Sequence, residues 1–321
     1  MRILLTTTSY QDTPGGHHEL LEASGFEVVR ARGPLDEAAM LELIEREGPF
    51  DATLNGDDAL TSRVIDALLP ACKCLAKYGI GLDSIDVEHA TGKKLPVLFT
   101  PGVNHTTVAE HAIGLMIAAA KHFWLHASAV KGGRWKRQTG VELMNKTLGV
   151  VGMGRIGREV VKRASAFGMQ SVGHDLHWDE QFARAFAVER AKTLDDLLGR
   201  CDVVTLHTGL SEETRAMVNA QTLSLMREGA ILVNTARGGL VDEAAVADAC
   251  RSGKLYGYAT DVLETEPMRP PHPFLELDNV IITPHVGSRT GESVERQAIR
   301  ATRNLVNFLN GDDDYIQANT W

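Results

Sequence analysis

The sequence predicts an α/β protein built from two doubly wound parallel sheets. Short β-branched runs alternate with helical patterns along both halves of the chain, and strands that alternate with helices form parallel sheets through right-handed crossovers. At 321 residues, the chain is also long enough for about two domains, each with its own core. The two observations together predict two α/β domains.

The first hundred residues show this alternation most regularly. β-branched and apolar runs predict strands at 3–7, 26–30, 52–55, 74–76 and 97–99, and the patterns between them predict helices at 16–24, 36–47 and 62–69. The first apolar residues run straight into the polar segment Thr6–Thr8. We therefore expect the amino end to be a strand and not a secretory signal.

The second half begins with a long helix and continues with a second strand series. An alanine-rich pattern predicts one helix over 106–130, which could join two domains or line a subunit interface. We interpret Trp124 and Trp135 as packing residues. Strands are predicted at 148–151, 171–174, 203–206, 230–234, 256–259 and 280–282, with a closing helix at 292–309.

Composition excludes several classes of partner. The net charge of −9 would repel nucleic acid, and the longest apolar run, 112–120, is far shorter than the roughly 18 residues of a membrane span. We expect no nucleic-acid or membrane partner and a cytoplasmic protein. The four cysteines lack the paired spacing of a zinc site and are expected to be buried thiols: Cys72, Cys74, Cys201 and Cys250.

A glycine-rich turn lies between the predicted strand at 148–151 and a helical pattern. Gly152 allows the tight turn, Gly154 lets a pyrophosphate approach the main chain, and Gly157 lets the helix pack closely on the strand. An acid, Asp175, follows the next strand 18 residues after Gly157, where it would accept hydrogen bonds from a ribose. The unit predicts a dinucleotide site.

The residues around Asp175 favour NAD over NADP. A carboxylate there repels a 2′-phosphate, and Leu176 and His177 supply no fixed positive charge to offset it. NADP stays open, because Lys192 or a protonated His177 could reach the phosphate.

Three polar segments follow later predicted strands, at the sheet edge where open α/β proteins bind their ligands. They are 234–239, 261–267 and 283–288, and together they supply one guanidinium, several carboxylates and one imidazole. Oxidation of an alcohol by a nicotinamide needs such a proton acceptor and such a charge. The helical histidines lack a supporting carboxylate pattern, so we expect no metal site: His105, His111, His122 and His126.

The runs GVVGMGRIG, NTARGGLVDE, DVLETEP and TPHVGS, in this order and spacing, resemble the D-isomer-specific 2-hydroxyacid dehydrogenase family, which includes phosphoglycerate dehydrogenase and glyoxylate/hydroxypyruvate reductases. The match extends to 79–86 and 108–111 and so covers nearly the whole chain. The resemblance implies a Rossmann NAD-binding domain at 102–287, inserted into a flavodoxin-like substrate-binding domain of 1–101 plus 288–321. It also implies a homodimer and an active site in a cleft that closes over the substrate.

The resemblance carries catalytic roles onto matching positions. His285 would be the acid/base that exchanges a proton with the substrate oxygen. Glu266 would bond to that imidazole and raise its pKa; it is preferred to Glu264 because the family acid directly precedes a proline, here Pro267. Arg237 would bind the substrate carboxylate with its planar fork and polarise the carbonyl.

The resemblance also implies cofactor and substrate contacts. Asp261 would hold the nicotinamide carboxamide. The expected cofactor-binding residues are Gly152, Gly154, Arg155, Ile156, Gly157, Asp175, His207, Thr208, Thr235, Ala236, Asp261, Gly287 and Thr107. The expected substrate-binding residues are Tyr78, Ile80, Gly81 and Arg237. The pair Thr208-Gly209 stands where the family usually has a residue followed by a proline, which gives the loop beside the nicotinamide ribose more backbone freedom.

The implied activity is hydride transfer between NAD and a small D-2-hydroxy acid or its 2-oxo acid. A formate dehydrogenase is disfavoured, because that branch lacks the glutamate partner that Glu266 supplies. Two alternatives stay open: a 2-imino acid reductase, since C=N accepts hydride as C=O does, and a non-catalytic NAD(H)-sensing scaffold of the corepressor kind.

Overall fold

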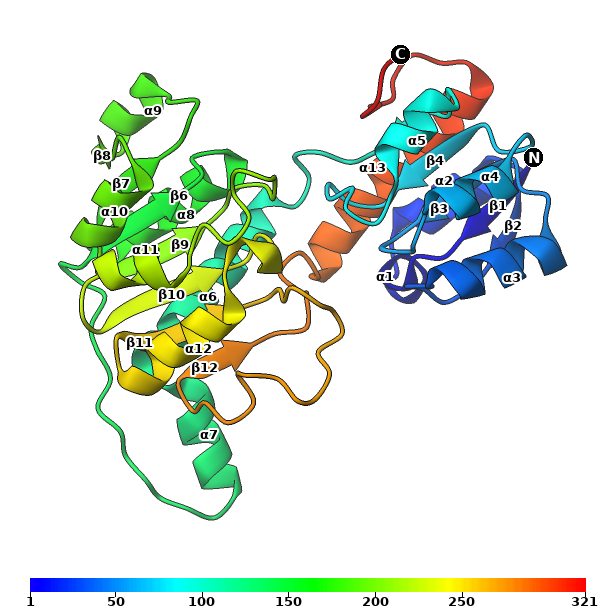
Figure 1. Ribbon diagram of the computed structural model, residues 1–321. Coiled ribbons are helices and arrows are strands. Elements are labelled where there is room, and N and C mark those ends of the chain that lie inside the picture. Colours follow the sequence, from blue (N-terminus) through cyan, green and yellow to red (C-terminus); the bar gives the residue numbers. More distant parts are fainter. The chain divides into compact units, whose positions relative to one another are not determined.

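The computed structural model describes all of residues 1–321, which form two compact units. Unit 1 comprises Met1–Asn104 and Arg289–Trp321, and unit 2 comprises His105–Ser288. Each unit contains one wholly parallel sheet with helices on both of its faces (Figure 1). The prediction of two doubly wound parallel sheets is confirmed.

Unit 1 has a five-stranded sheet in the order β2-β1-β3-β4-β5. The strands are β1 (Arg2–Leu5), β2 (Glu27–Arg30), β3 (Ala52–Asn55), β4 (Cys74–Lys77) and β5 (Val97–Leu98). Because successive strand side chains point to opposite faces, Leu4 belongs to one core cluster and Ile3 and Leu5 to another. Each face therefore has a core of its own.

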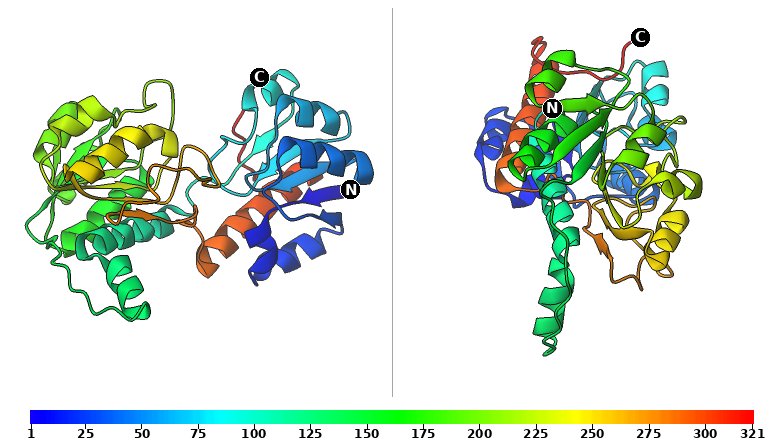
Figure 2. Two further views of the ribbon diagram at one scale, coloured as in Figure 1. Left: turned by 60° about the horizontal axis from the view of Figure 1, so that its bottom comes forward. Right: turned by 90° about the vertical axis from the view of Figure 1, so that its left-hand side faces the viewer.

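Six helices cover the two faces of this sheet. They are α1 (Thr8–Asp12), α2 (Gly16–Ala23), α3 (Glu37–Glu47), α4 (Ser62–Leu68), α5 (Val87–Gly92) and α13 (Gly291–Asn310). The buried side chains of α3, α4 and α5 pack on one face, and those of α1, α2 and α13 pack on the other. The last helix thus completes a core that begins with the first strand, as the orange and blue ribbons in Figure 2 show.

Unit 2 has a seven-stranded sheet in the order β12-β11-β10-β9-β6-β7-β8. The strands are β6 (Thr147–Val151), β7 (Gln170–His174), β8 (Val188–Arg190), β9 (Val203–Leu206), β10 (Ala230–Asn234), β11 (Leu255–Thr260) and β12 (Val280–Ile282). On one face pack α6 (His105–Lys121), α8 (Arg155–Ala166) and α9 (Glu180–Ala185). On the other face pack α10 (Leu194–Arg200), α11 (Ala220–Leu225) and α12 (Glu243–Ser252).

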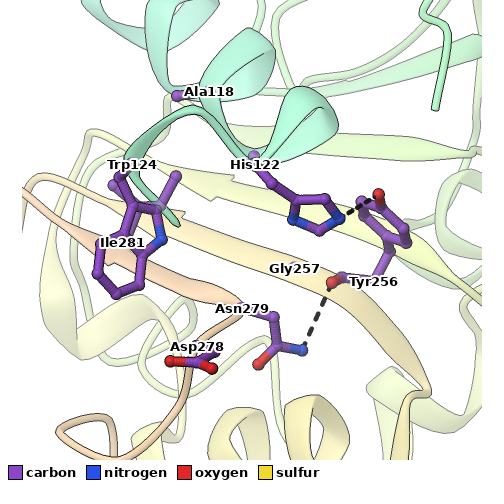
Figure 3. Close-up of a pocket in the computed structure, with 9 residues that line it drawn as sticks. Ala118, His122, Trp124, Tyr256, Gly257, Asp278, Asn279 and Ile281 are labelled. Carbon is purple, nitrogen blue, oxygen red and sulfur yellow. Dashed lines mark hydrogen bonds between the residues drawn. The ribbon is translucent and has the colours of Figure 1, made fainter. Parts of the chain in front are cut away.

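The prediction of one helix over 106–130 is wrong. The chain forms α6 and then α7 (Phe123–Lys131), bent by 65°, with His122 between them in the left-handed conformation. A hydrogen bond of 2.5 Å between His122 Nε2 and the Tyr256 hydroxyl ties this bend to β11 (Figure 3). No single helix here could cross a membrane; only α6 and α7 together, as a bent pair, have the length and composition for it.

Within a single chain, neither Trp124 nor Trp135 packs into the core, contrary to the interpretation from the sequence. Trp124 is 38% exposed and Trp135 is 78% exposed, and no residue of α7 is buried. In Figures 1 and 2, α7 extends away from the sheet of its unit. We call residues 123–144, with α7 and the extended segment after it, the arm.

Candidate active site

The turn after β6 has the geometry that its glycines predict. Gly152 has φ +93, and a Cβ there would lie 2.6 Å from the backbone carbonyl oxygen of His207. A Cβ on Gly157 would collide with the carbonyl oxygen of Gly152. Gly154 faces open space, because a Cβ there would meet nothing within 4 Å. The main chain is therefore bare at the start of α8, where Arg155 and Ile156 follow.

Asp175 lies against this turn. One of its carboxylate oxygens accepts a hydrogen bond of 2.6 Å from the amide of Met153, and the other accepts one of 2.7 Å from the amide of His177. The acid follows β7, which pairs with β6, so the fold brings it from the next strand to the glycine turn. Leu176, beside it, is 87% exposed.

Two buried polar atoms near this sheet edge have no protein partner, and they fit a bound dinucleotide. They are Thr235 Oγ1, just after β10, and His207 Nδ1, just after β9. The strands β9 and β10 pair with each other, and β9 also pairs with β6. Burial lowers the pKa of His207 to about 3, so the ring is neutral, and its Nε2 is bonded to Thr205 at 2.9 Å.

His285 lies in the loop after β12 and contacts a carboxylate. Its Nδ1 is 2.8 Å from Glu266 Oε2, while Glu266 Oε1 accepts a hydrogen bond of 2.9 Å from the amide of Leu263. The two side chains are 47% and 37% exposed, so solvent reaches the pair. Glu264 points elsewhere, with its carboxylate 3.7 Å from Arg215.

Arg237 follows β10, the strand beside β11. Asn234 holds its loop, because the side-chain amide of Asn234 donates a hydrogen bond of 2.8 Å to the Arg237 carbonyl oxygen. A Cβ on Gly238 would collide with the backbone of Leu263, so the loops that carry Arg237 and Glu266 touch there. The carboxyl ends of three neighbouring strands thus supply the guanidinium, the carboxylate and the imidazole.

Asp261 is buried at the end of β11, with a relative exposure of 2%. It accepts hydrogen bonds of 2.6 Å from the Thr283 hydroxyl, 2.9 Å from the amide of Val286 and 2.7 Å from the amide of Gly287. Burial raises the pKa of Asp261, but these bonds and one from His111 lower it by more than burial raises it. The pKa therefore lies below its usual value. Asp261 is therefore a buried, ionised carboxylate.

The remaining expected residues lie in several places. Thr107 is buried on α6, and Thr208 and Ala236 are half-buried beside His207 and Thr235. Tyr78, Ile80 and Gly81 belong to unit 1, where they follow β4.

Burial raises the pKa of Tyr78, and Ile80 is 42% exposed. The sequence analysis assigned no role to Thr283, although this residue lies in the TPHVGS run. The signal that could have identified it is a hydroxyl side chain directly after a predicted strand.

No group of three or more His, Cys, Asp or Glu side chains is placed to hold a metal ion. The four cysteines are buried free thiols, as predicted. Burial raises the pKa of Cys72, Cys201 and Cys250 to about 12, which disfavours their reactive thiolate forms.

Residues 113–287 match the family model described as the NAD binding domain of D-isomer specific 2-hydroxyacid dehydrogenases. The chain belongs to this family. The predicted family is therefore confirmed, and unit 2 carries the NAD-binding domain of that family.

Named relatives and a solved structure agree with this assignment. The chain is 38% identical to a D-3-phosphoglycerate dehydrogenase of Methanocaldococcus jannaschii over 97% of its own length, but it spans only 58% of that relative. It is 42% identical to a hydroxypyruvate reductase of Thermotoga maritima, over 74% of this chain and 78% of the relative. The TT0316 protein of Thermus thermophilus is similar in structure, with a TM-score of 0.89, 37% identity and coverage of 99% of this chain and 100% of that protein.

Proposed function

We propose that this protein transfers a hydride between NAD and a small D-2-hydroxy acid or the corresponding 2-oxo acid. The observation that carries the proposal is the contact between His285 and Glu266. This pair lies at the same edge of the sheet as Arg237. An imidazole paired with a carboxylate is suited to proton exchange, and a guanidinium is suited to binding a carboxylate. Family membership supports the same activity.

Each residue has a defined part in the proposed reaction. NAD, when bound, supplies the hydride or accepts it. Because Glu266 accepts a hydrogen bond from Nδ1 of His285, the other ring nitrogen, Nε2, is the atom that exchanges a proton with the substrate oxygen. Arg237 binds the substrate carboxylate and draws charge from the adjacent carbonyl.

Cofactor and substrate contacts are proposed for residues placed at strand ends. The bare main chain at Gly154 is suited to the pyrophosphate, and Asp175 is suited to the adenosine ribose. Thr235 and His207 offer unpartnered polar atoms near the same edge. In unit 1, the main-chain amides at Ile80 and Gly81 are proposed to bind the substrate carboxylate, with Tyr78 beside its side chain.

The arm supports a homodimer. It exposes large apolar side chains that a chain in water normally covers: Phe123 (55%), Trp124 (38%), Val130 (50%), Trp135 (78%) and Met144 (60%). We propose that a second copy of the chain covers them. A cytoplasmic location also stays a prediction, in keeping with the buried free thiols.

The decisive experiment follows oxidation of NADH and of NADPH by absorbance. The acceptors are a panel of 2-oxo acids, namely glyoxylate, hydroxypyruvate, pyruvate and 2-oxoglutarate with branched, aromatic and basic members, each with and without ammonia. We expect NADH oxidation with at least one 2-oxo acid in the absence of ammonia. Turnover that requires ammonia would instead indicate an imino acid reductase, and NADH binding without any turnover would indicate a sensor.

Arg237→Ala is the matching test of substrate binding. Loss of the guanidinium should raise KM for the 2-oxo acid and lower kcat together, because the same contact binds the carboxylate and polarises the carbonyl. NADH binding, measured by fluorescence titration, should persist. Normal kinetics in a folded Arg237→Ala protein would remove this residue from the site.

A further inference from the structure

His111 lies on α6 and reaches the loop that carries His285. Its Nε2 is 2.9 Å from Thr283 Oγ1 and 3.3 Å from Asp261 Oδ1, and its side chain is 23% exposed. Three separate segments therefore meet at this ring: α6, the end of β11 and the end of β12. The proposed function uses none of His111's chemistry.

The positions of the hydrogen atoms in this network can be deduced from the atoms that can only accept. Asp261 is ionised and can only accept. The single hydroxyl hydrogen of Thr283 is donated to Asp261 Oδ1, at 2.6 Å. The hydroxyl oxygen must then accept a hydrogen bond from His111, so Nε2 carries a hydrogen and faces two acceptors.

His111 is one of four groups that contact the Asp261 carboxylate. Oδ1 receives the Thr283 hydroxyl, the amide of Val286 and the more distant His111 Nε2. Oδ2 receives the amide of Gly287 at 2.7 Å and keeps one further acceptor position. Removal of the imidazole would leave the Thr283 hydroxyl oxygen without its donor and would take away the His111 contact on Oδ1. The Thr283 hydroxyl and the amides of Val286 and Gly287 would then hold the carboxylate alone.

The same carboxylate shapes the backbone around His285. We call Thr283–Gly287 the catalytic loop. His285 has φ +52, a conformation that a side chain other than glycine rarely adopts. Its backbone amide donates a hydrogen bond of 2.9 Å to the backbone oxygen of Asp261. The backbone amides of Val286 and Gly287 donate to the Asp261 side chain. A Cβ on Gly287 would lie 2.8 Å from Oδ2, so the loop closes tightly on Asp261.

We propose that His111 is a positioning residue that orients the Asp261 carboxylate and thereby holds His285 in its working place. The inference rests on the proposed function, since it assigns His111 a role relative to the acid/base His285. It predicts an effect on turnover more than on substrate affinity, because Arg237, proposed to bind the substrate carboxylate, follows a different strand. A displacement of about 1 Å at a reacting group can cost on the order of 100-fold in rate.

Three variants separate the parts of the argument. His111→Leu removes the donor and keeps a similar bulk, whereas His111→Gln can place an amide N–H where Nε2 lies. Thr283→Val removes the hydroxyl with little change in shape and leaves the histidine in place. Glu110→Gln is the control, because this residue neighbours His111 on α6, its side chain is 61% exposed, and its carboxylate contacts Arg163 instead of the network.

The first measurement is hydrogen–deuterium exchange of the catalytic loop in the ligand-free protein. We expect faster exchange at Val286 and Gly287 in His111→Leu and in Thr283→Val, and unchanged exchange in Glu110→Gln. Wild-type exchange at these amides in both the leucine and the valine proteins would overturn the proposal. This readout does not depend on activity, so it tests His111 even if no substrate is turned over.

The second measurement is steady-state kinetics with the best 2-oxo acid. His111→Leu should lower kcat by about 10- to 100-fold with KM changed little, and His111→Gln should recover part of the loss. Unchanged kcat in a folded His111→Leu protein would overturn the inference while leaving the proposed function intact. Absence of turnover in the wild type would overturn the proposed function instead.

Discussion

The single residue on which the proposed chemistry depends most is His285. We expect His285→Ala to lower kcat by about 10²- to 10⁴-fold, the range for loss of a general acid/base. NADH affinity should stay near that of the wild type, because the glycine turn and Asp175 are untouched. Kinetics combined with fluorescence titration of NADH would check both parts. A folded variant with wild-type kcat would refute the acid/base role.

His207 makes stability depend on pH. Burial lowers its pKa to about 3, whereas an unfolded histidine titrates near 6.5. Between these values the unfolded chain binds a proton that the folded chain does not, so the free energy of unfolding should fall as pH decreases from about 6.5 toward 3. The lowered pKa of Asp261 acts in the same direction at the acid end.

The variant His207→Gln should reduce this dependence. Urea midpoints measured near pH 7 and near pH 5 should differ less in His207→Gln than in the wild type. His177→Gln, at an exposed position, is the control and should keep the wild-type difference. Equal differences in all three proteins would contradict the role given to His207.

Individual residues differ in how far the sequence could place them. Glu266 could be singled out from Glu264 because a proline follows it, and the structure puts Glu266 on the His285 ring and Glu264 near Arg215. The partners of Asp261 could not be predicted. They come from segments far along the chain, and only the folded sheet brings His111 and Thr283 to the same carboxylate.

Among the elements, the glycine turn and α8 permit a matched pair of variants. Gly154→Ala should leave stability within about 0.5 kcal/mol, because a Cβ there meets no atom within 4 Å. It should still weaken NADH binding about tenfold, or about 1.4 kcal/mol, by keeping the pyrophosphate off the main chain. Thermal unfolding and NADH titration test the two statements separately.

Gly157→Ala should instead affect both properties. Its Cβ would collide with the Gly152 carbonyl oxygen, so α8 must shift, at a cost of about 1–3 kcal/mol in stability together with weaker NADH binding. If Gly154→Ala bound NADH like the wild type, the turn would not be the pyrophosphate site. If Gly157→Ala were as stable as the wild type, the close approach of helix and turn would not matter to the fold.

Buried central strands were the most predictable elements, because a continuous apolar run between turns is a local signal. The runs 203–206 and 230–234 coincide with β9 and β10. The edge strand β8 was not predicted, since only Val188 of its three residues is buried. The break between α6 and α7 was also missed, because the bond at His122 comes from Tyr256, 134 residues away.

At the scale of the whole molecule, the arm predicts the assembly. Trp135→Asp should shift the protein from dimer toward monomer, because a charge would be placed at the most exposed apolar side chain of the arm. Sedimentation velocity would measure the change. Trp321→Asp is the control, since Trp321 is 60% exposed but belongs to unit 1, whereas the arm belongs to unit 2. A monomeric wild type, or equal effects of both variants, would contradict the assignment.

The path of the chain through the two units also sets the order in which they can be completed during synthesis. The helix α13 contributes Ala298, Ala301 and Leu305 to the same core as Ile3 and Leu5. A ribosome that adds about 5–20 residues per second makes all of unit 2 before this helix, which takes roughly 10 to 40 seconds. During that interval one face of the nascent first sheet lacks its longest helix, so the apolar side chains of that face stay uncovered until α13 has been made.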